Sequence, residues 1–337
     1  MIRRTALAYA LATGALALLT VFAFALGRFP ISALELAQLV ANKLFGAAYD
    51  IAPSAETVVL QVRGPRILAA LLVGAALAAA GTAYQGMFRN PLVSPDILGV
   101  SAGAALGAVL GIFFSQSALV IQLGAFAGGL AAVGLVYAVG SNVRRHDPIL
   151  SLILAGIVLG TLLGAMIALL KYLADPYNQL PAITYWLLGS LAAVSPGDLA
   201  LAAPFALAGL VPLYLLRWRM NLLSLSDDEA RALGVPVARL RIAVVCAATL
   251  MTAAAVAISG IIGWVGLLIP HAARMLIGPE FSRLLPLSMV LGAAFLLAVD
   301  TLARTVAPIE IPPGVLTALI GTPFFLWLFV TARRAWQ

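Results

Sequence analysis

The chain has 337 residues, of which 63% are hydrophobic and only 10% are charged, and its net charge is +7. A soluble domain carries about 25% charged residues, and disorder requires low hydrophobicity together with high charge, so both classes are excluded. The composition indicates a polytopic membrane protein. Because no polar stretch is long enough to fold alone, we expect a single membrane domain over residues 1–337.

The basic residues form short clusters between apolar stretches and are not interleaved with aromatic residues, which argues against nucleic-acid binding. The single cysteine, Cys246, excludes an internal disulfide. At the start of the chain, Arg3-Arg4 precedes an uncharged stretch that continues to Gly27. This stretch is longer than the roughly 7–15 apolar residues of a signal peptide, so we expect an uncleaved first span.

A helix needs about 20 apolar residues to cross the hydrocarbon core of a bilayer. In chain order, the uncharged stretches that each predict one span are 5–27, 67–88, 149–170, 199–216, 284–299 and 311–332. The stretch 97–143 predicts two spans, with a turn near Ser115. The segment 242–273 is too long for one span and short for two, with a break at Ser259-Gly260 and Gly263.

The basic pairs Arg3-Arg4 and Arg333-Arg334 flank the two ends of the chain, and the positive-inside preference places both ends in the cytoplasm. An even number of spans is then required, so ten spans are favoured over nine. The predicted cytoplasmic loops carry Arg89, Arg144-Arg145, Arg217, Arg219, Arg231, Arg239, Arg241 and Arg283. The opposite loops carry Arg28, Lys43, Arg63, Arg66, Lys171 and Arg304.

Residues 89–96, RNPLVSPD, interrupt the apolar sequence after the second predicted span. Pro91 and Pro95 prevent the flanking spans from fusing into one helix, and Asp96 suits the positive end of the next helix. We interpret this stretch as a cytoplasmic turn. Glycines then recur every four residues, which predicts close helix packing, at Gly103, Gly107 and Gly111 and again at Gly156, Gly160 and Gly164.

Carboxylates and histidines within spans mark proton relays and ion-coupled transport, and the predicted spans are nearly free of them. Asp300 lies at the end of a span, and His146 and His271 belong to no recognisable metal-binding pattern. A phosphate-binding loop of the GxxxxGK[ST] form is also absent from the sequence. We therefore predict no catalytic residue and no metal ligand, and an ion-coupled secondary transporter is the weaker alternative.

The longest charged stretch, residues 217–241, is RWRMNLLSLSDDEARALGVPVARLR. Ser226 and Glu229 have the spacing of a capping box, and Gly234 followed by Pro236 fits a helix stop. The pattern predicts a short surface helix of about two turns. It is either a solvated loop or a docking element for a partner that supplies energy.

Four stretches together resemble the FecCD-like permease subunits of ABC importers for iron-siderophore, haem and vitamin B12. They are residues 62–104, 226–241, 259–278 and 297–328, which include VRGPRILAALLVGAALAAAGTAYQGMFRNPLVSPDILGVSAGA and SGIIGWVGLLIPHAARMLIG. The resemblance implies an all-α, polytopic membrane protein with about ten transmembrane helices and the type II ABC importer permease fold. It also implies a multi-pass inner (plasma) membrane protein that forms a homodimer in membrane lipid, with two cytoplasmic ABC ATPase subunits and a periplasmic or lipoprotein substrate-binding protein. ATP and Mg would bind the partner ATPase and no cofactor would bind this chain.

The resemblance assigns roles residue by residue. The helix that couples to the ATPase would contain Asp227, Asp228, Glu229, Ala230, Leu233, Gly234 and Val235. Docking of the binding protein would use Arg63, Arg66 and Arg304, and the cytoplasmic gate would include Ser141 and Asn142. The expected substrate is a ferric siderophore, because residues 169–191 look like siderophore-type members; haem and cobalamin stay open as alternatives.

Overall fold

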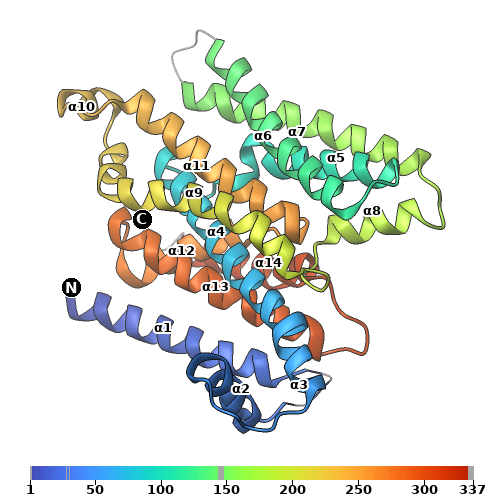
Figure 1. Ribbon diagram of the computed structural model, residues 1–337. Helices are drawn as coiled ribbons and strands as arrows, with labels where there is room; N and C mark the ends of the chain where they lie inside the picture. The colour runs from blue at the N-terminus through green and yellow to red at the C-terminus, as the bar shows by residue number, and fades with distance from the viewer. Residues whose placement is uncertain (1, 28, 30, 143–147, 333–337) are drawn as a thin grey trace.

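The computed structural model describes residues 2–27, 29, 31–142 and 148–332, and its regular elements within these ranges are helices (Figure 1). Seven helices are long and apolar enough to cross a membrane: α1 (Ile2–Ala25), α4 (Gly64–Phe88), α6 (Ala118–Asn142), α7 (Pro148–Leu173), α9 (Pro196–Met220), α11 (Val237–Ser259) and α13 (Phe281–Thr305). Three shorter apolar helices are α5 (Val100–Phe113), α12 (Val265–Ile277) and α14 (Pro313–Ala332). Together these helices correspond to the predicted spans.

The segment that the sequence left ambiguous forms two helices. α11 ends at Ser259, the chain turns at Gly260 with φ +65°, and α12 begins at Val265. Glycine tolerates this left-handed conformation without steric cost. The break therefore lies where the sequence placed it, and the second helix of the pair is short.

The helix α4 forms the centre of the bundle and packs against α9, α11, α12 and α13. In the helix that contains α4, 78% of the residues in the apolar stretch of 18 residues are buried, in contrast to 11% for α1 and 6% for α7. Two glycine-mediated crossings allow the close approach: Gly81 lies against the backbone of Gly266 in α12, and Gly74 lies against Gly292 in α13. A side chain at any of these positions would collide with the backbone of the neighbouring helix.

The predicted glycine faces behave differently from each other. Gly103 and Gly107 of α5 pack against the backbone of α6, as the spacing predicts. Gly156 of α7 packs against the carbonyl of Ile97, whereas a side chain at Gly160 would meet nothing within 4 Å. The glycine face of α7 is thus covered at Gly156 and uncovered at Gly160 and Gly164 in the single chain.

The region between the first two spans holds more structure than the sequence indicates. It contains the amphipathic helix α2 (Ala33–Phe45), then α3 (Pro53–Thr57) and a π-helical segment, η1 (Val58–Arg63), that continues into α4. Residues 53–88 form one continuous helix of 36 residues, nearly twice the length that a bilayer core requires. The remaining short elements are η2 (Pro95–Leu98), α8 (Gln179–Leu188), η3 (Asn221–Ser224) and α10 (Asp227–Ala232).

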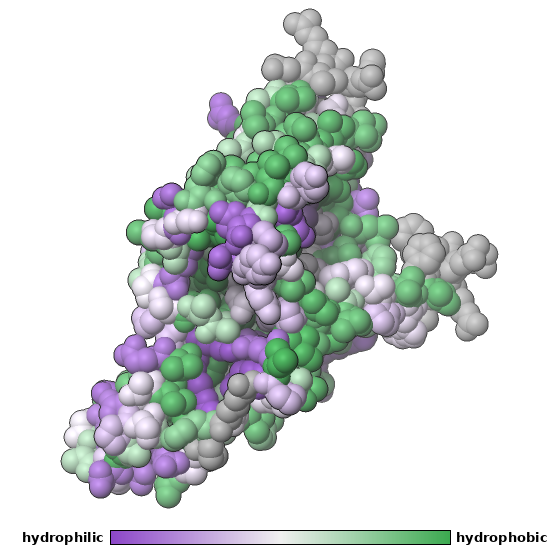
Figure 2. All heavy atoms as spheres, turned by 90° about the vertical axis from the view of Figure 1, so that its right-hand side faces the viewer, coloured by the Kyte–Doolittle hydropathy of each residue, from purple (hydrophilic) through white to green (hydrophobic). Residues whose placement is uncertain are grey.

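The two ends of the bundle differ in their contents. One end carries α10 and the first turns of α1 and α13 (Figure 1), and there the Tyr9 hydroxyl donates to the carbonyl of Arg283 and the amide of Phe281 donates to Oδ1 of Asn221 at 2.7 Å. The opposite end faces the viewer in Figure 2, where hydrophilic residues gather across the middle, apolar surface predominates above them, and hydrophilic and apolar residues mix in the lowest part. The candidate sites lie at these two ends.

Candidate functional site

The helix α10 is fixed at its amino end by the predicted capping box. The amide of Glu229 donates to the Ser226 hydroxyl at 3.3 Å, and the amide of Ser226 donates to the Glu229 carboxylate at 2.9 Å. Two of the amides that a helix start leaves without partners are thereby satisfied. The carboxylates of Asp227 and Asp228 lie in the first turn, where the helix dipole favours negative charge.

The carboxyl end of α10 is closed by a Schellman motif. The amide of Val235 donates to the carbonyl of Ala230 at 3.1 Å, and the amide of Gly234 donates to the carbonyl of Arg231 at 2.9 Å. Gly234 has φ +78°, the left-handed conformation that this motif requires. A helix of six residues would fray if it were isolated, so these two end motifs define its length.

Asp227 attaches α10 to the membrane helices. Its carboxylate accepts two hydrogen bonds from the Arg241 guanidinium at 2.7 and 2.8 Å, and a third from Arg89 at 2.9 Å. Arg89 also donates to the carbonyl of Leu223 at 2.8 Å. The contacts connect the turn after α4, the end of η3 and the start of α11 through one carboxylate.

The same contacts determine the protonation of Asp227. Partial burial acts to raise the pKa of the carboxyl, but the hydrogen bonds and positive charges of Arg241 and Arg89 outweigh it and hold the pKa below its usual value. Hydrogen bonds from the side chain and backbone of Ser226 likewise lower the pKa of Glu229. Both groups are therefore ionised at neutral pH.

The predicted coupling residues divide into an anchored set and an exposed set. Ala230 and Val235 are buried against the bundle, and Asp227 is engaged by the two arginines. Asp228 and Leu233 point outward, the former 96% exposed and the latter 63%. The structure thus presents an exposed helix, anchored through Asp227, at one end of the bundle.

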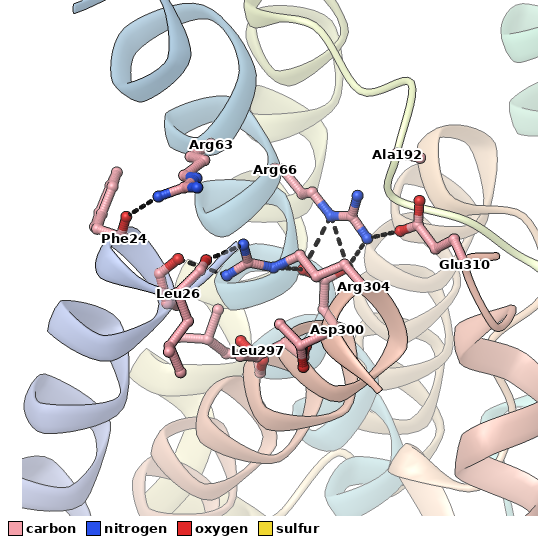
Figure 3. Close-up of polar contacts among 12 residues, drawn as sticks. Phe24, Leu26, Arg63, Arg66, Ala192, Leu297, Asp300, Arg304 and Glu310 are labelled. Atoms are coloured by element: carbon pink, nitrogen blue, oxygen red, sulfur yellow. Dashed lines mark hydrogen bonds and ion pairs between the residues drawn. The ribbon is translucent and has the colours of Figure 1, made fainter. Parts of the chain in front are cut away.

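At the other end, two of the predicted docking arginines close the end of α1 (Figure 3). Arg63 donates to the carbonyls of Phe24 and Ala25, the latter at 3.3 Å. Arg304 donates to the carbonyl of Leu26 at 2.6 Å. The last carbonyls of a helix lack hydrogen-bond donors within it. Here the guanidinium groups of Arg63 in η1 and Arg304 in α13 donate to carbonyls at the end of α1, and their positive charges also suit the helix dipole.

The third arginine, Arg66, is held by carboxylates of the same chain. Its guanidinium donates to both oxygens of Asp300 at 2.8 to 3.0 Å and also contacts Glu310 (Figure 3). Asp300 is fully buried, and Arg304 lies 3.8 Å from its second oxygen. The carboxylate that the sequence places at the end of a span is thus neutralised by two arginines.

The arginine cluster, Arg63, Arg66 and Arg304, lines a cavity of about 280 Å³ together with Glu310 and Phe29. The structure brings the three predicted arginines together, although they come from opposite ends of the chain. Their guanidinium groups are largely engaged inside the chain: the Arg66 and Arg304 side chains are each 11% exposed. Docking through these residues stays a prediction. An acidic side chain of a binding protein would have to displace Glu310 from Arg66.

The predicted gate residues Ser141 and Asn142 form the last turn of α6, and their side chains lie outside the described part of the structure. Sequence reasoning missed Arg89 and Arg241 as partners of Asp227, and it missed Asp300 and Glu310 as partners of Arg66. Arg89 and Arg241 were read as members of positively charged cytoplasmic loops. A buried acid four residues before Arg304 was the available signal for the second group.

Comparison with known proteins identifies the family to which the chain is similar. A model of the FecCD transport family matches residues 15–331. The chain is 43% identical over 320 residues to the molybdate import system permease MolB of Haemophilus influenzae, with 95% of this chain and 94% of that protein covered. It is 42% identical over 282 residues to a permease protein of an iron chelatin transport system of Helicobacter pylori, with 83% and 84% covered.

Among solved structures, the fold matches an ABC transporter assigned to the metal-chelate type and captured in an inward-facing conformation. The TM-score is 0.85 at 41% sequence identity, with 95% of this chain and 97% of that chain covered. Both the sequence and the arrangement of helices are therefore shared over nearly the whole length.

Proposed function

The chain belongs to the FecCD transport family, and from this premise we propose that it carries a ferric siderophore inward by alternating access. It is the permease subunit of an ABC importer for metal chelates, and nucleotide binds a partner ATPase rather than this chain. The substrates named for the relatives differ, with molybdate for one and an iron chelate for another. The choice of a ferric siderophore rests on the likeness of residues 169–191 to siderophore-type members.

The observation that carries the proposal is the construction of the coupling segment, residues 217–241. Asp227 is bound by Arg89 and Arg241, so a force applied to α10 would reach α4 and α11 without loss in a flexible loop. Asp228 and Leu233 would contact the cleft of an ATPase subunit. ATP-driven closure of two such subunits would move the paired α10 helices and reopen the pathway.

The positions of the arginines support the membrane orientation that we propose. The α10 end would face the cytoplasm of a cell with this protein in its inner (plasma) membrane, because that end collects Arg89, Arg217, Arg241 and Arg283. Both termini would then be cytoplasmic. The arginine cluster would face a periplasmic or lipoprotein binding protein, and the uncovered face of α7 would contribute to a homodimer interface along the pathway.

Uptake by the reconstituted complex tests the proposal. The chain, its ATPase and its binding protein are placed in liposomes, and uptake of labelled ferric siderophore, haem, cobalamin and molybdate is measured with and without ATP. We expect ATP-dependent uptake of the ferric siderophore above the other three. Uptake driven by an ion gradient without ATP would refute the proposal and favour a secondary transporter, and preference for another substrate would correct the choice of cargo alone.

A further inference from the structure

The helix α2 has two apolar faces, and the bundle covers only one of them. Leu36 and Leu39 face inward, where they contact Phe24 of α1 and the η1 residues Val58 and Val59. Helical spacing places a second apolar set on the opposite side, which we call the outer face of α2: Leu34, Ala37, Val40, Ala41, Leu44 and Phe45. Its large side chains are exposed, up to 72% for Leu44 and 82% for Phe45.

This exposure belongs to a well-formed element. Ser32 and Glu35 form a capping box at the start of α2, and Gly46 ends the helix in the left-handed conformation with φ +67°. Lys43 forms an ion pair with Glu56 of α3 at 2.7 Å. The helix is thus capped at both ends and held by an ion pair on its inner side, so the outer face points away from the bundle.

The outer face of α2 continues a surface that contacts lipid. α1 has 24 residues, about 36 Å at 1.5 Å per residue against a hydrocarbon core of about 30 Å, so its last turn, which α2 contacts at Phe24, lies near the bilayer boundary. The outward side chains Leu18 and Phe22 of this spanning helix are exposed. Figure 1 shows α2 beside the last part of α1, on the side away from α4 and α13.

The chemistry of the outer face fits a bilayer boundary. It holds no charged residue: helical spacing places Lys43 on the inner side between Leu36 and Leu39, where it pairs with Glu56, and Glu35 at the edge of that side. Exposed aromatic residues cluster at this level, with Phe29 before α2 and Phe45 and Tyr49 at its end. Aromatic residues at the boundary and an amphipathic helix parallel to it are characteristic of membrane interfaces.

We propose that α2 is an interfacial membrane helix whose outer face inserts into the leaflet on the side of the arginine cluster. Leu34, Leu44 and Phe45 contact acyl chains, and the capping box of Ser32 and Glu35 stays at the level of the headgroups. The occupant of this face is phospholipid. The proposal is independent of the substrate and of the partners named above.

Site-directed spin labelling of the full chain in nanodiscs of phosphatidylcholine and phosphatidylglycerol tests the proposal. The single cysteine is replaced (Cys246→Ser), and one cysteine is introduced at a time as Leu44→Cys or Leu34→Cys. Two leucines of similar exposure provide matched references: Leu11→Cys on the lipid side of α1 and Leu233→Cys on α10, with 64% and 63% exposure in the native protein. Collision rates with molecular oxygen and with water-soluble NiEDDA are then measured.

We expect labels at Leu44 and Leu34 to collide with oxygen in preference to NiEDDA, with a ratio several-fold above that at Leu233 and approaching that at Leu11. Since all four positions are exposed, the labels leave the packing of the bundle unchanged, and unaltered elution and melting of each variant checks this. Ratios at both α2 positions equal to that at Leu233 would overturn the proposal. That result would place the outer face in water, where a soluble partner is the alternative occupant.

Discussion

Replacing Arg66 with methionine should strongly destabilise the protein. The change removes three hydrogen bonds of 2.8 to 3.0 Å to Asp300, which is fully buried, and leaves that carboxylate with Arg304 at 3.8 Å as its nearest cation. Removing one partner of a buried ion pair typically costs about 3–5 kcal/mol, because the other charge stays buried. At about 2 °C per kcal/mol for a large domain, we expect the Tm to fall by roughly 6–10 °C.

The assay is thermal unfolding of the detergent-solubilised chain, followed by tryptophan fluorescence. The matched control is Lys43→Met, which breaks an ion pair with Glu56 whose side chains are 53% and 41% exposed; exposed pairs contribute about 0–1 kcal/mol, so its Tm should change by at most about 2 °C. The Tm of the double variant Arg66→Met with Asp300→Leu should fall by less than the sum of the two single decreases. Both charged groups of the pair are then removed, so neither is left buried without its partner. An Arg66→Met variant that melts with the control would refute this account of the cluster.

Three further predictions concern α10 and the helix crossings. Gly234→Ala introduces a Cβ at φ +78° in open space, so it should cost about 1–2 kcal/mol of conformational strain and lower ATP-driven uptake in proteoliposomes. Because the folded-state pKa of Asp227 is depressed, the stability that its carboxylate contributes is complete above the unfolded-state pKa and is lost as the pH falls through the folded-state pKa. The Tm difference between wild type and Asp227→Asn should therefore shrink below about pH 4. Gly81→Leu should abolish recovery of monodisperse protein, since its side chain would enter the backbone of Gly266, whereas Gly160→Leu, with nothing within 4 Å, should leave the folding of the single chain intact; equal recovery of both variants would contradict the packing described.

The fold was predictable to the extent that a bilayer constrains the sequence. Uncharged length alone identified the spans, and Ser259-Gly260 marked the break between α11 and α12. The region between α1 and α4 was not predicted, because α2 is neither long enough to span nor polar enough to be a loop. The predicted span over 67–88 begins after Arg66, whereas the helix runs through this charged residue from Pro53.

The helix α10 was predictable because its signals are local. The capping box at Ser226 and the stop at Gly234 need only residues within two turns. Ion pairs that join distant segments leave no such mark: Arg66 and Asp300 are separated by 234 positions, and only the folded bundle brings them together. The pairing of Arg66 with the buried Asp300 could therefore not be predicted from the sequence, from which we expected Arg66 in an outward-facing loop.

The closure of α1 by side chains has a consequence for biosynthesis. Arg63 follows its acceptor Phe24 by 39 positions, whereas Arg304 follows its acceptor Leu26 by 278. At about 5–20 residues per second, the ribosome needs on the order of tens of seconds between the synthesis of Arg63 and that of Arg304. The carboxyl end of α1 therefore acquires its donor from Arg304 only after α13 has been made.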